Sequence, residues 1–135
     1  MKIKVQFFEK KLVDAVGAGV YEIYARANDK EKLLYVGESV FVLIRCATHL
    51  YEISKGNGYL GFDKDKIENE DITLIFKLND NIPSKKDRLI REKELIKTNN
   101  PVMQSGIKDR VKTIAVMITE LTNFLNDVED SACIK

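Results

Sequence analysis

The sequence predicts an α/β domain with a small, mainly antiparallel three-stranded sheet flanked by helices, and with an extra C-terminal helix. Residues 19–25 and 33–37 are short runs whose side chains alternate between two faces, and a polar link joins them. Two such runs around a turn are typical of a β-hairpin. Residues 72–78 are rich in β-formers and predict a third, largely buried strand. Apolar residues recur at helical spacing after these runs, so helices complete the predicted domain.

The predicted hairpin places two tyrosines on one face. Successive side chains of an extended strand point to opposite faces, and strand parity therefore puts Tyr21 and Tyr35 on the same side of the sheet. The link over residues 27–32 is polar and contains the turn formers Asn28 and Asp29. We expect a loop of about five residues between the two strands.

A helix follows the hairpin directly. Ser39 is a suitable N-cap for it, and the helix is expected to run to Ile53. Arg45 and the only histidine of the chain, His49, are four residues apart, so they lie one turn apart on one side of this helix. Most other residues near Arg45 are apolar, which favours a polar site as the environment of its side chain.

Two further helices are predicted. Ser84 caps a helix of about 14 residues that contains Glu92, and Pro101 stops it. Residues 107–128 carry apolar side chains every three or four positions, which predicts an amphipathic C-terminal helix.

The remaining segments give weaker signals. Residues 2–8 are either a short strand or a lead-in, and residues 8–16 have helical spacing. Residues 59–71 are expected to form a loop with an acidic tail.

Length and composition bound the class of protein. A chain of 135 residues corresponds to one domain, here residues 1–135, and 44% hydrophobic residues with 32% charged residues are ordinary for a soluble globule. The net charge of +1 does not by itself indicate a nucleic-acid partner. No apolar run approaches the ~20 residues of a membrane span, and the N-terminus is unlike a secretion signal. We expect a cytoplasmic protein in which Cys46 and Cys133 are reduced thiols.

Four sequence elements occur in an order that is seen in one group of nucleases. Gly19-Val20-Tyr21 is followed by Tyr35-Val36-Gly37, and Arg45 comes ten residues after the second tyrosine. Farther along, Glu92 begins a Glu-x-x-Leu-Ile-Lys run that precedes Asn100-Pro101. In these elements and their spacing, the sequence resembles the GIY-YIG nuclease superfamily.

The resemblance covers residues 19–104 and implies a GIY-YIG-like core with endonuclease activity. It implies hydrolysis of DNA phosphodiester bonds with a single divalent ion, Mg²⁺ or Mn²⁺. Glu92 would be the metal ligand, and the ion can stabilise the leaving oxygen. Tyr21 would be the general base, and Tyr35 would orient water and phosphate.

The resemblance also implies roles for two residues of the first helix. A phenol has a pKa near 10 and is a poor base at neutral pH, so Tyr21 needs a nearby cation that favours the phenolate. Arg45 is expected to supply that cation or to hold phosphate through its fork of donors. His49 matches a histidine that assists proton transfer in part of the superfamily.

A basic stretch indicates where nucleic acid would bind. Residues 85–112 contain nine Lys/Arg against four Asp/Glu, and this stretch includes Glu92. Such a surface suits a phosphate backbone. DNA is the expected partner and RNA stays open, as does the oligomeric state. The candidate nucleic-acid contacts are Arg45, Arg88, Arg91, Lys93 and Gln104.

Two departures from the superfamily pattern favour a second interpretation. Glu38 stands where many members have a basic residue, and Gln104 stands where an asparagine is common. Tyrosines in strands also often serve packing alone, and a charged helix is often simply solvated. The alternative function is a catalytically weakened module that binds nucleic acid or a protein partner.

Overall fold

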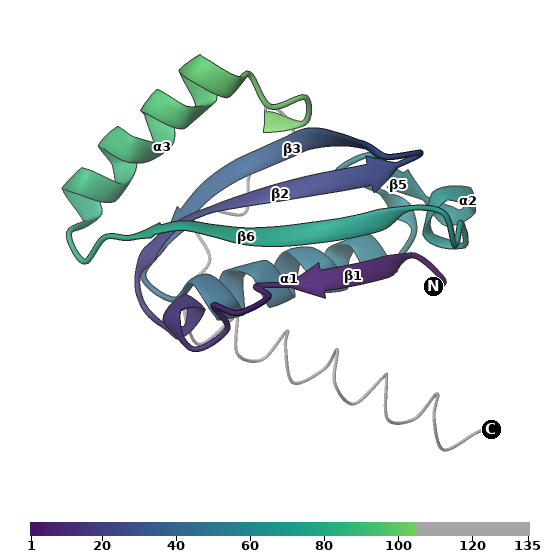
Figure 1. The fold of residues 1–135 in the computed structure, drawn as a ribbon, viewed down its shortest axis with the longest axis horizontal. Coiled ribbons are helices and arrows are strands. Elements are labelled where there is room, and N and C mark those ends of the chain that lie inside the picture. Colours follow the sequence, from purple (N-terminus) through teal and green to yellow (C-terminus); the bar gives the residue numbers. More distant parts are fainter. Residues whose placement is uncertain (105–135) are drawn as a thin grey trace.

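A four-stranded mixed sheet organises the molecule, and the α/β class is confirmed. The computed structural model describes residues 1–104. The strand order is β1-β6-β2-β3; β2 pairs antiparallel with both β3 and β6, whereas β1 pairs parallel with β6 (Figure 1). The strands are β1 (Lys4–Phe7), β2 (Gly19–Ala27), β3 (Lys30–Ser39) and β6 (Thr73–Asn81).

The prediction of a three-stranded sheet is wrong, because β1 adds a fourth strand at one edge. Lys4–Phe7 pairs in register with residues 73–76 of β6. The ring of Phe7 packs edge-on against that of Phe76, with centroids 5.0 Å apart. Parallel pairing between segments about 70 residues apart has no local sequence signal, which is why residues 2–8 were compatible with either a strand or a lead-in.

The hairpin of β2 and β3 is tighter than predicted. Its turn consists of Asn28 and Asp29 alone, with φ angles of 54° and 63°. Two consecutive residues with positive φ are typical of a type I′ turn, whose twist matches that of the strands. The expected five-residue loop is therefore wrong: the polar residues 30–32 continue the strand instead of the turn.

The two longest helices among residues 1–104 occupy different sides of the sheet. Helix α1 (Val42–Ser54) packs against the face that carries Tyr21 and Tyr35, and α3 (Lys85–Asn99) contacts β3 and β2 (Figure 1). None of the described helices is long and apolar enough to cross a membrane.

The helix caps agree with the sequence at one helix and not at the other. Ser84 caps α3 by accepting a hydrogen bond from the backbone N of Asp87, and Asn100 ends the helix in the left-handed conformation. Ser39 is not the N-cap of α1: it is the last residue of β3, and its Oγ accepts from the backbone N of Phe41. The serine therefore stabilises the turn between strand and helix.

The segments between these elements are short. Residues 8–16 form only one 3₁₀ turn, η1 (Asp14–Val16). The predicted loop at 59–71 is partly structured and includes β5 (Phe62–Asp63) and α2 (Lys64–Ile67); β5 pairs with β4 (Asn57–Tyr59). The helix predicted over 107–128, like Cys133, lies outside the described residues.

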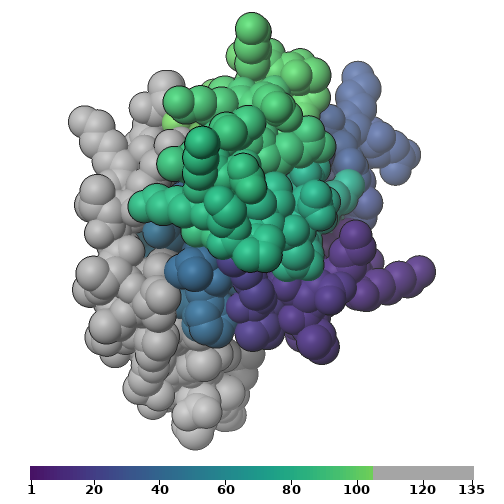
Figure 2. Space-filling model, turned by 90° about the vertical axis from the view of Figure 1, so that its left-hand side faces the viewer, coloured from purple at the N-terminus to yellow at the C-terminus, as the bar shows by residue number. Residues whose placement is uncertain are grey.

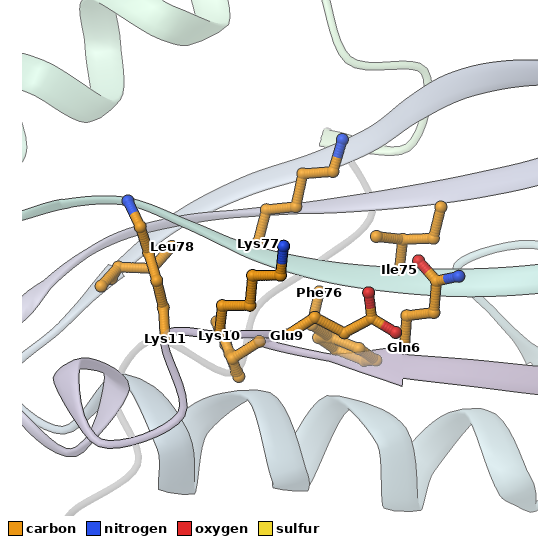
Figure 3. A pocket seen from close by; sticks show the side chains of 9 residues that line it. Gln6, Glu9, Lys10, Lys11, Ile75, Phe76, Lys77 and Leu78 are labelled. Carbon is orange, nitrogen blue, oxygen red and sulfur yellow. The ribbon is translucent and has the colours of Figure 1, made fainter.

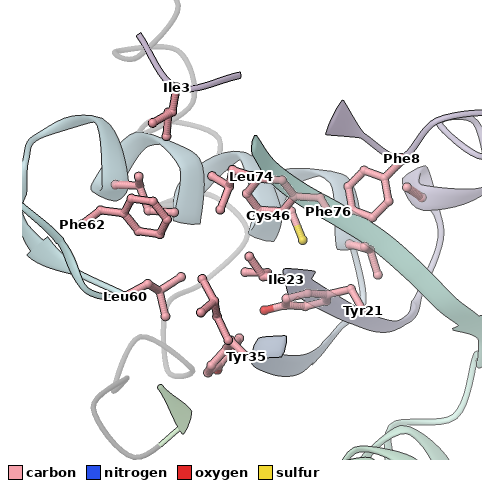
Figure 4. Packing of buried hydrophobic residues seen from close by; sticks show 14 of the residues in the cluster. Ile3, Phe8, Tyr21, Ile23, Tyr35, Cys46, Leu60, Phe62, Leu74 and Phe76 are labelled. Atoms are coloured by element: carbon pink, nitrogen blue, oxygen red, sulfur yellow. The ribbon is translucent and has the colours of Figure 1, made fainter. Parts of the chain in front are cut away.

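The main core lies between the sheet and α1, and a smaller one lies under α3. Figure 4 shows the main core, in which Tyr21, Ile23 and Tyr35 of the hairpin pack with Cys46 of α1. Leu95 of α3 packs on the other face in a small cluster with Val20 and Val36. The residues of β2 that face α1, Tyr21 and Ile23, are therefore apolar or aromatic and buried, while the opposite face mixes buried Val20 with polar Glu22.

Candidate active site

Three of the predicted site residues are in direct contact. The hydroxyl of Tyr21 lies 2.7 Å from Nε2 of His49, and the Tyr35 ring packs against the imidazole with centroids 5.1 Å apart. The two tyrosine rings are 6.3 Å apart. All three side chains are buried, with at most 1% of their surface exposed. Residues from β2, β3 and α1 thus form one cluster, which we call the Tyr–His cluster.

Gly37 allows the Tyr21 ring to reach this position. The register of the hairpin pairs Tyr21 with Gly37 on β3. A Cβ atom on Gly37 would lie 2.3 Å from the Tyr21 hydroxyl oxygen and 2.4 Å from its Cζ. The phenol therefore lies across the neighbouring strand, in space that any side chain at position 37 would fill.

Tyr59 joins the Tyr–His cluster although the sequence did not indicate it. Its hydroxyl lies 2.8 Å from Nδ1 of His49. Gly56, with φ of 66°, reverses the chain after α1, and the following hairpin returns Tyr59 to the helix. The sequence signal for this contact was Gly56. A glycine after a helix can reverse the chain, which then runs back along the helix. A tyrosine ten residues after His49 can therefore reach that histidine.

Arg45 lies one turn before His49 on α1, as predicted, but not in an open polar site. Only 6% of its surface is exposed. A guanidinium at this depth is held within the protein, where its charge acts at a lower dielectric than in solvent. Arg45 and His49 thus lie one turn apart on α1, and both are buried.

Glu92 lies on the inner face of α3. It is 3% exposed, and the residues one turn before and after it, Arg88 and Leu95, are also buried. Glu94 is exposed and pairs with Arg91 at 3.3 Å. Of the two carboxylates in the motif, Glu92 thus faces inward and Glu94 faces solvent. Helix α3, which carries Glu92, packs on the face of the sheet that includes Val36. The Tyr–His cluster lies on the opposite face, against α1.

Arg88, a predicted nucleic-acid contact, is bonded within the protein. Its Nε donates to Oε2 of Glu38 at 2.8 Å, and its Nη1 donates to the carbonyls of Ile82 and Pro83. The Arg88 side chain is 5% exposed. The acid at position 38 therefore has a buried cationic partner, and this pair joins α3 to the end of β3.

Gln104, another predicted contact, completes the edge of β3. Its Oε1 accepts from the backbone N of Val36, and its Nε2 donates to the Val36 carbonyl, both at 2.9 Å. Strand β3 is at the edge of the sheet. The Gln104 amide therefore makes, at Val36, the two hydrogen bonds that a neighbouring strand would otherwise make. Of the predicted nucleic-acid contacts, Arg91 and Lys93 remain on the outer part of α3, where Lys93 is exposed.

The solvent-facing side of α3 is basic. Figure 2 shows α3 in green at the top of one side of the molecule, with the η1 segment below it. The exposed lysines of this helix are Lys85, Lys86, Lys93 and Lys97. We call this surface the α3 lysine face.

A polar group lies on the side of β2 opposite the Tyr–His cluster. The Glu22 carboxylate accepts hydrogen bonds from the Tyr24 hydroxyl at 3.0 Å and from Nδ2 of Asn79 at 3.3 Å. Burial, and next the charge of Glu22, raise the pKa of Tyr24 to about 12. Tyr24 is thus a neutral hydrogen-bond donor at any physiological pH.

A groove of about 400 Å³ lies at the β1 side of β6, away from β3. Figure 3 shows the side chains around it, among them Lys10, Lys11 and Lys77, with Phe76 of β6 beside Glu9. No residue of the Tyr–His cluster lines this groove.

Glu92 fits the predicted metal in its donor chemistry. A carboxylate is the hard oxygen ligand that Mg²⁺ and Mn²⁺ prefer, and Mg²⁺ sites commonly use only one or two protein carboxylates. Within residues 1–104, no three His, Cys, Asp or Glu side chains form a group that would hold an ion.

Comparisons of the chain with protein-family models, with curated proteins and with solved structures found no match.

Proposed function

We propose that this chain is a metal-dependent DNA endonuclease of the GIY-YIG type. The observation that carries the proposal is the hydrogen bond between Tyr21 and His49, with Tyr35 packed on the same imidazole. Three residues selected from motifs on three separate elements meet in one cluster. The antiparallel arrangement of β3, β2 and β6, with the helix of Arg45 after the hairpin and the helix of Glu92 after β6, is the order that the resemblance implies.

The cluster can generate a base for hydrolysis. His49 Nε2 can accept the Tyr21 proton along the 2.7 Å hydrogen bond, which leaves a phenolate that can take a proton from the attacking water. Arg45, one turn before His49 on α1, would favour the phenolate by its positive charge. Tyr35 fixes the imidazole plane by ring packing, so that Nε2 stays directed at Tyr21.

Glu92 would hold the divalent ion, which when bound supplies stabilisation of the leaving oxygen. The carboxylate is kept on the inner side of α3 by the burial of its neighbours Arg88 and Leu95. The Arg88–Glu38 pair holds α3 against β3. It thereby fixes the rotation of α3 about its own axis, which keeps Glu92 on the inner side.

The α3 lysine face is the proposed contact with the DNA backbone. Lysine ammonium groups at the surface attract phosphate without reading base sequence. Each phosphate contact should contribute a slope of about −0.9 to the dependence of log affinity on log salt.

Burial of the cluster favours a second candidate, a module that binds nucleic acid without cutting it. Neither Tyr21, Arg45, His49 nor Glu92 is more than 6% exposed, whereas hydrolysis requires water and phosphate to reach the reacting groups. Such a module would keep the α3 lysine face and use the buried polar residues for stability.

Cleavage of plasmid DNA with and without Mg²⁺ separates the two functions. Glu92→Gln should abolish cleavage and leave DNA binding equal or tighter, because a negative charge near phosphate is removed. Glu94→Gln is the matched control, since this exposed residue lies two positions along the same helix; it should cut at the wild-type rate. Wild-type protein that binds DNA and never cuts it would establish the second function, and cutting by Glu92→Gln would refute the metal assignment.

A further inference from the structure

His49 is bonded to a phenol on each side of its ring. Tyr21 lies 2.7 Å from Nε2, and Tyr59 lies 2.8 Å from Nδ1. Tyr21 and His49 have 1% and 0% of their surface exposed, respectively. Tyr59 is only partly buried, so of the three it is the residue that reaches the surface.

We propose that Tyr59 is a positioning residue that holds His49 as the Nδ1–H tautomer and passes its proton to solvent. The proposal rests on the proposed nuclease function, in which Tyr21 must lose its proton. A neutral imidazole has one donor and one acceptor nitrogen. If Nε2 is to accept from Tyr21, Nδ1 must carry the hydrogen, and its 2.8 Å neighbour, the Tyr59 oxygen, accepts that hydrogen bond.

The proton transfer balances along this chain of hydrogen bonds. The O–H bond of Tyr21 breaks and an N–H bond forms at Nε2, giving a phenolate and an imidazolium. The Nδ1 proton then moves to the Tyr59 oxygen while the Tyr59 hydroxyl gives its own proton to a water molecule. The result is a Tyr21 phenolate, a neutral His49 carrying its hydrogen on Nε2, a neutral Tyr59 and a proton in solvent.

Burial is the reason that such an outlet is needed. An imidazolium inside the protein is disfavoured by desolvation, and His49 itself has no exposed surface through which water could take its proton. Tyr59 belongs to the β4–β5 hairpin, which is separate from the main sheet. It directly precedes the two-residue turn at Leu60 and Gly61, and this hairpin places it next to α1. Its hydroxyl contacts the buried ring, and Tyr59 is the partly exposed residue of the three.

The tautomer can be measured without DNA or metal. The chain has one histidine, so every imidazole ¹⁵N signal belongs to His49. Wild-type protein should show a protonated Nδ1 and an unprotonated Nε2. Tyr59→Phe keeps the ring but removes the acceptor, and Tyr21 can either donate to Nε2 or accept from it, so the variant should populate the Nε2–H tautomer. Protonated Nε2 in the wild type, or an unchanged tautomer in Tyr59→Phe, would overturn the proposal.

Cleavage kinetics test the use of this arrangement. Single-turnover DNA cleavage by Tyr59→Phe should be slower by about 100-fold, the lower end of general acid–base contributions. Tyr24→Phe is the matched control, because it removes a hydroxyl from the opposite face of β2, and it should cut like the wild type. Equal rates for Tyr59→Phe and an active wild type would overturn the relay alone. A wild type that cuts no DNA would overturn the nuclease function and the relay with it, whatever tautomer His49 shows.

Discussion

Replacing Gly37 by alanine should displace the Tyr21 phenol and destabilise the fold. The new Cβ would lie 2.3 Å from the Tyr21 oxygen, 2.4 Å from its Cζ and 2.9 Å from Cε2 of Tyr35. Non-bonded heavy atoms prefer separations of about 3.5–4.0 Å, so the end of the Tyr21 ring must retreat by more than about 1 Å. That movement breaks or lengthens its 2.7 Å hydrogen bond to His49.

The magnitude follows from three opposing effects. Overpacking a core costs about 1–3 kcal/mol, and leaving a buried hydrogen-bonding group without its partner costs a further 1–3 kcal/mol or so. Alanine is better than glycine in a strand by about 0.5–1 kcal/mol. The expected net loss in the free energy of unfolding is about 1–5 kcal/mol, with a central value of about 3 kcal/mol. With an m-value near 2 kcal/mol/M, the urea midpoint should fall by about 1–2 M.

Two companion variants make the measurement specific. Gly17→Ala is the control, because its Cβ would meet its nearest atom at 3.4 Å and the φ angle of Gly17 is −83°; its midpoint should stay close to that of the wild type. Tyr21→Leu combined with Gly37→Ala should be less destabilised than the two single losses together, by about 0.5–3 kcal/mol of coupling. If Gly37→Ala unfolds at the wild-type urea concentration, the Tyr21 ring does not lie across β3.

Three further outcomes are expected. Glu38→Lys should lower stability by about 3–5 kcal/mol in urea unfolding, because it removes the carboxylate partner of the buried Arg88 and places a cation there; unaltered stability would show that the pair does not join α3 to β3. Gln104→Ala should cost about 1–3 kcal/mol and speed hydrogen exchange of the β3 amide that it caps. The pKa of Tyr24 is about 12 in the folded protein, against a usual value of 10.0. The protonated Tyr24 phenol therefore stabilises the fold fully below pH 10, and this stabilisation is lost as the pH rises through about 12. Tyr24→Phe, which no longer bonds Glu22, should lose less stability than the wild type over that range, and parallel losses would contradict the shift.

Local interactions explain which elements the sequence predicted well. The hairpin, the Ser84 cap and the helix stop before Pro101 depend on residues within a few positions of each other, and the structure has all three. Strand parity depends only on counting, so it placed Tyr21 and Tyr35 on one face correctly. The five-residue loop was wrong because both Asn28 and Asp29 adopt positive φ, which allowed the strands to continue to the turn.

The sequence by itself thus determined the α/β class and the order of the main elements, whereas the burial of Glu92 on the inner face of α3 came from the structure. The tertiary structure alone decided three features: the parallel edge strand β1, the pairing of Glu38 with Arg88 and the contact of Tyr59 with His49. Each of these joins elements through the packing of side chains or strand edges whose relative position no local pattern specifies. The periodicity of one segment fixes which side of it is buried, but the partner that covers that side depends on how the whole chain packs around the sheet.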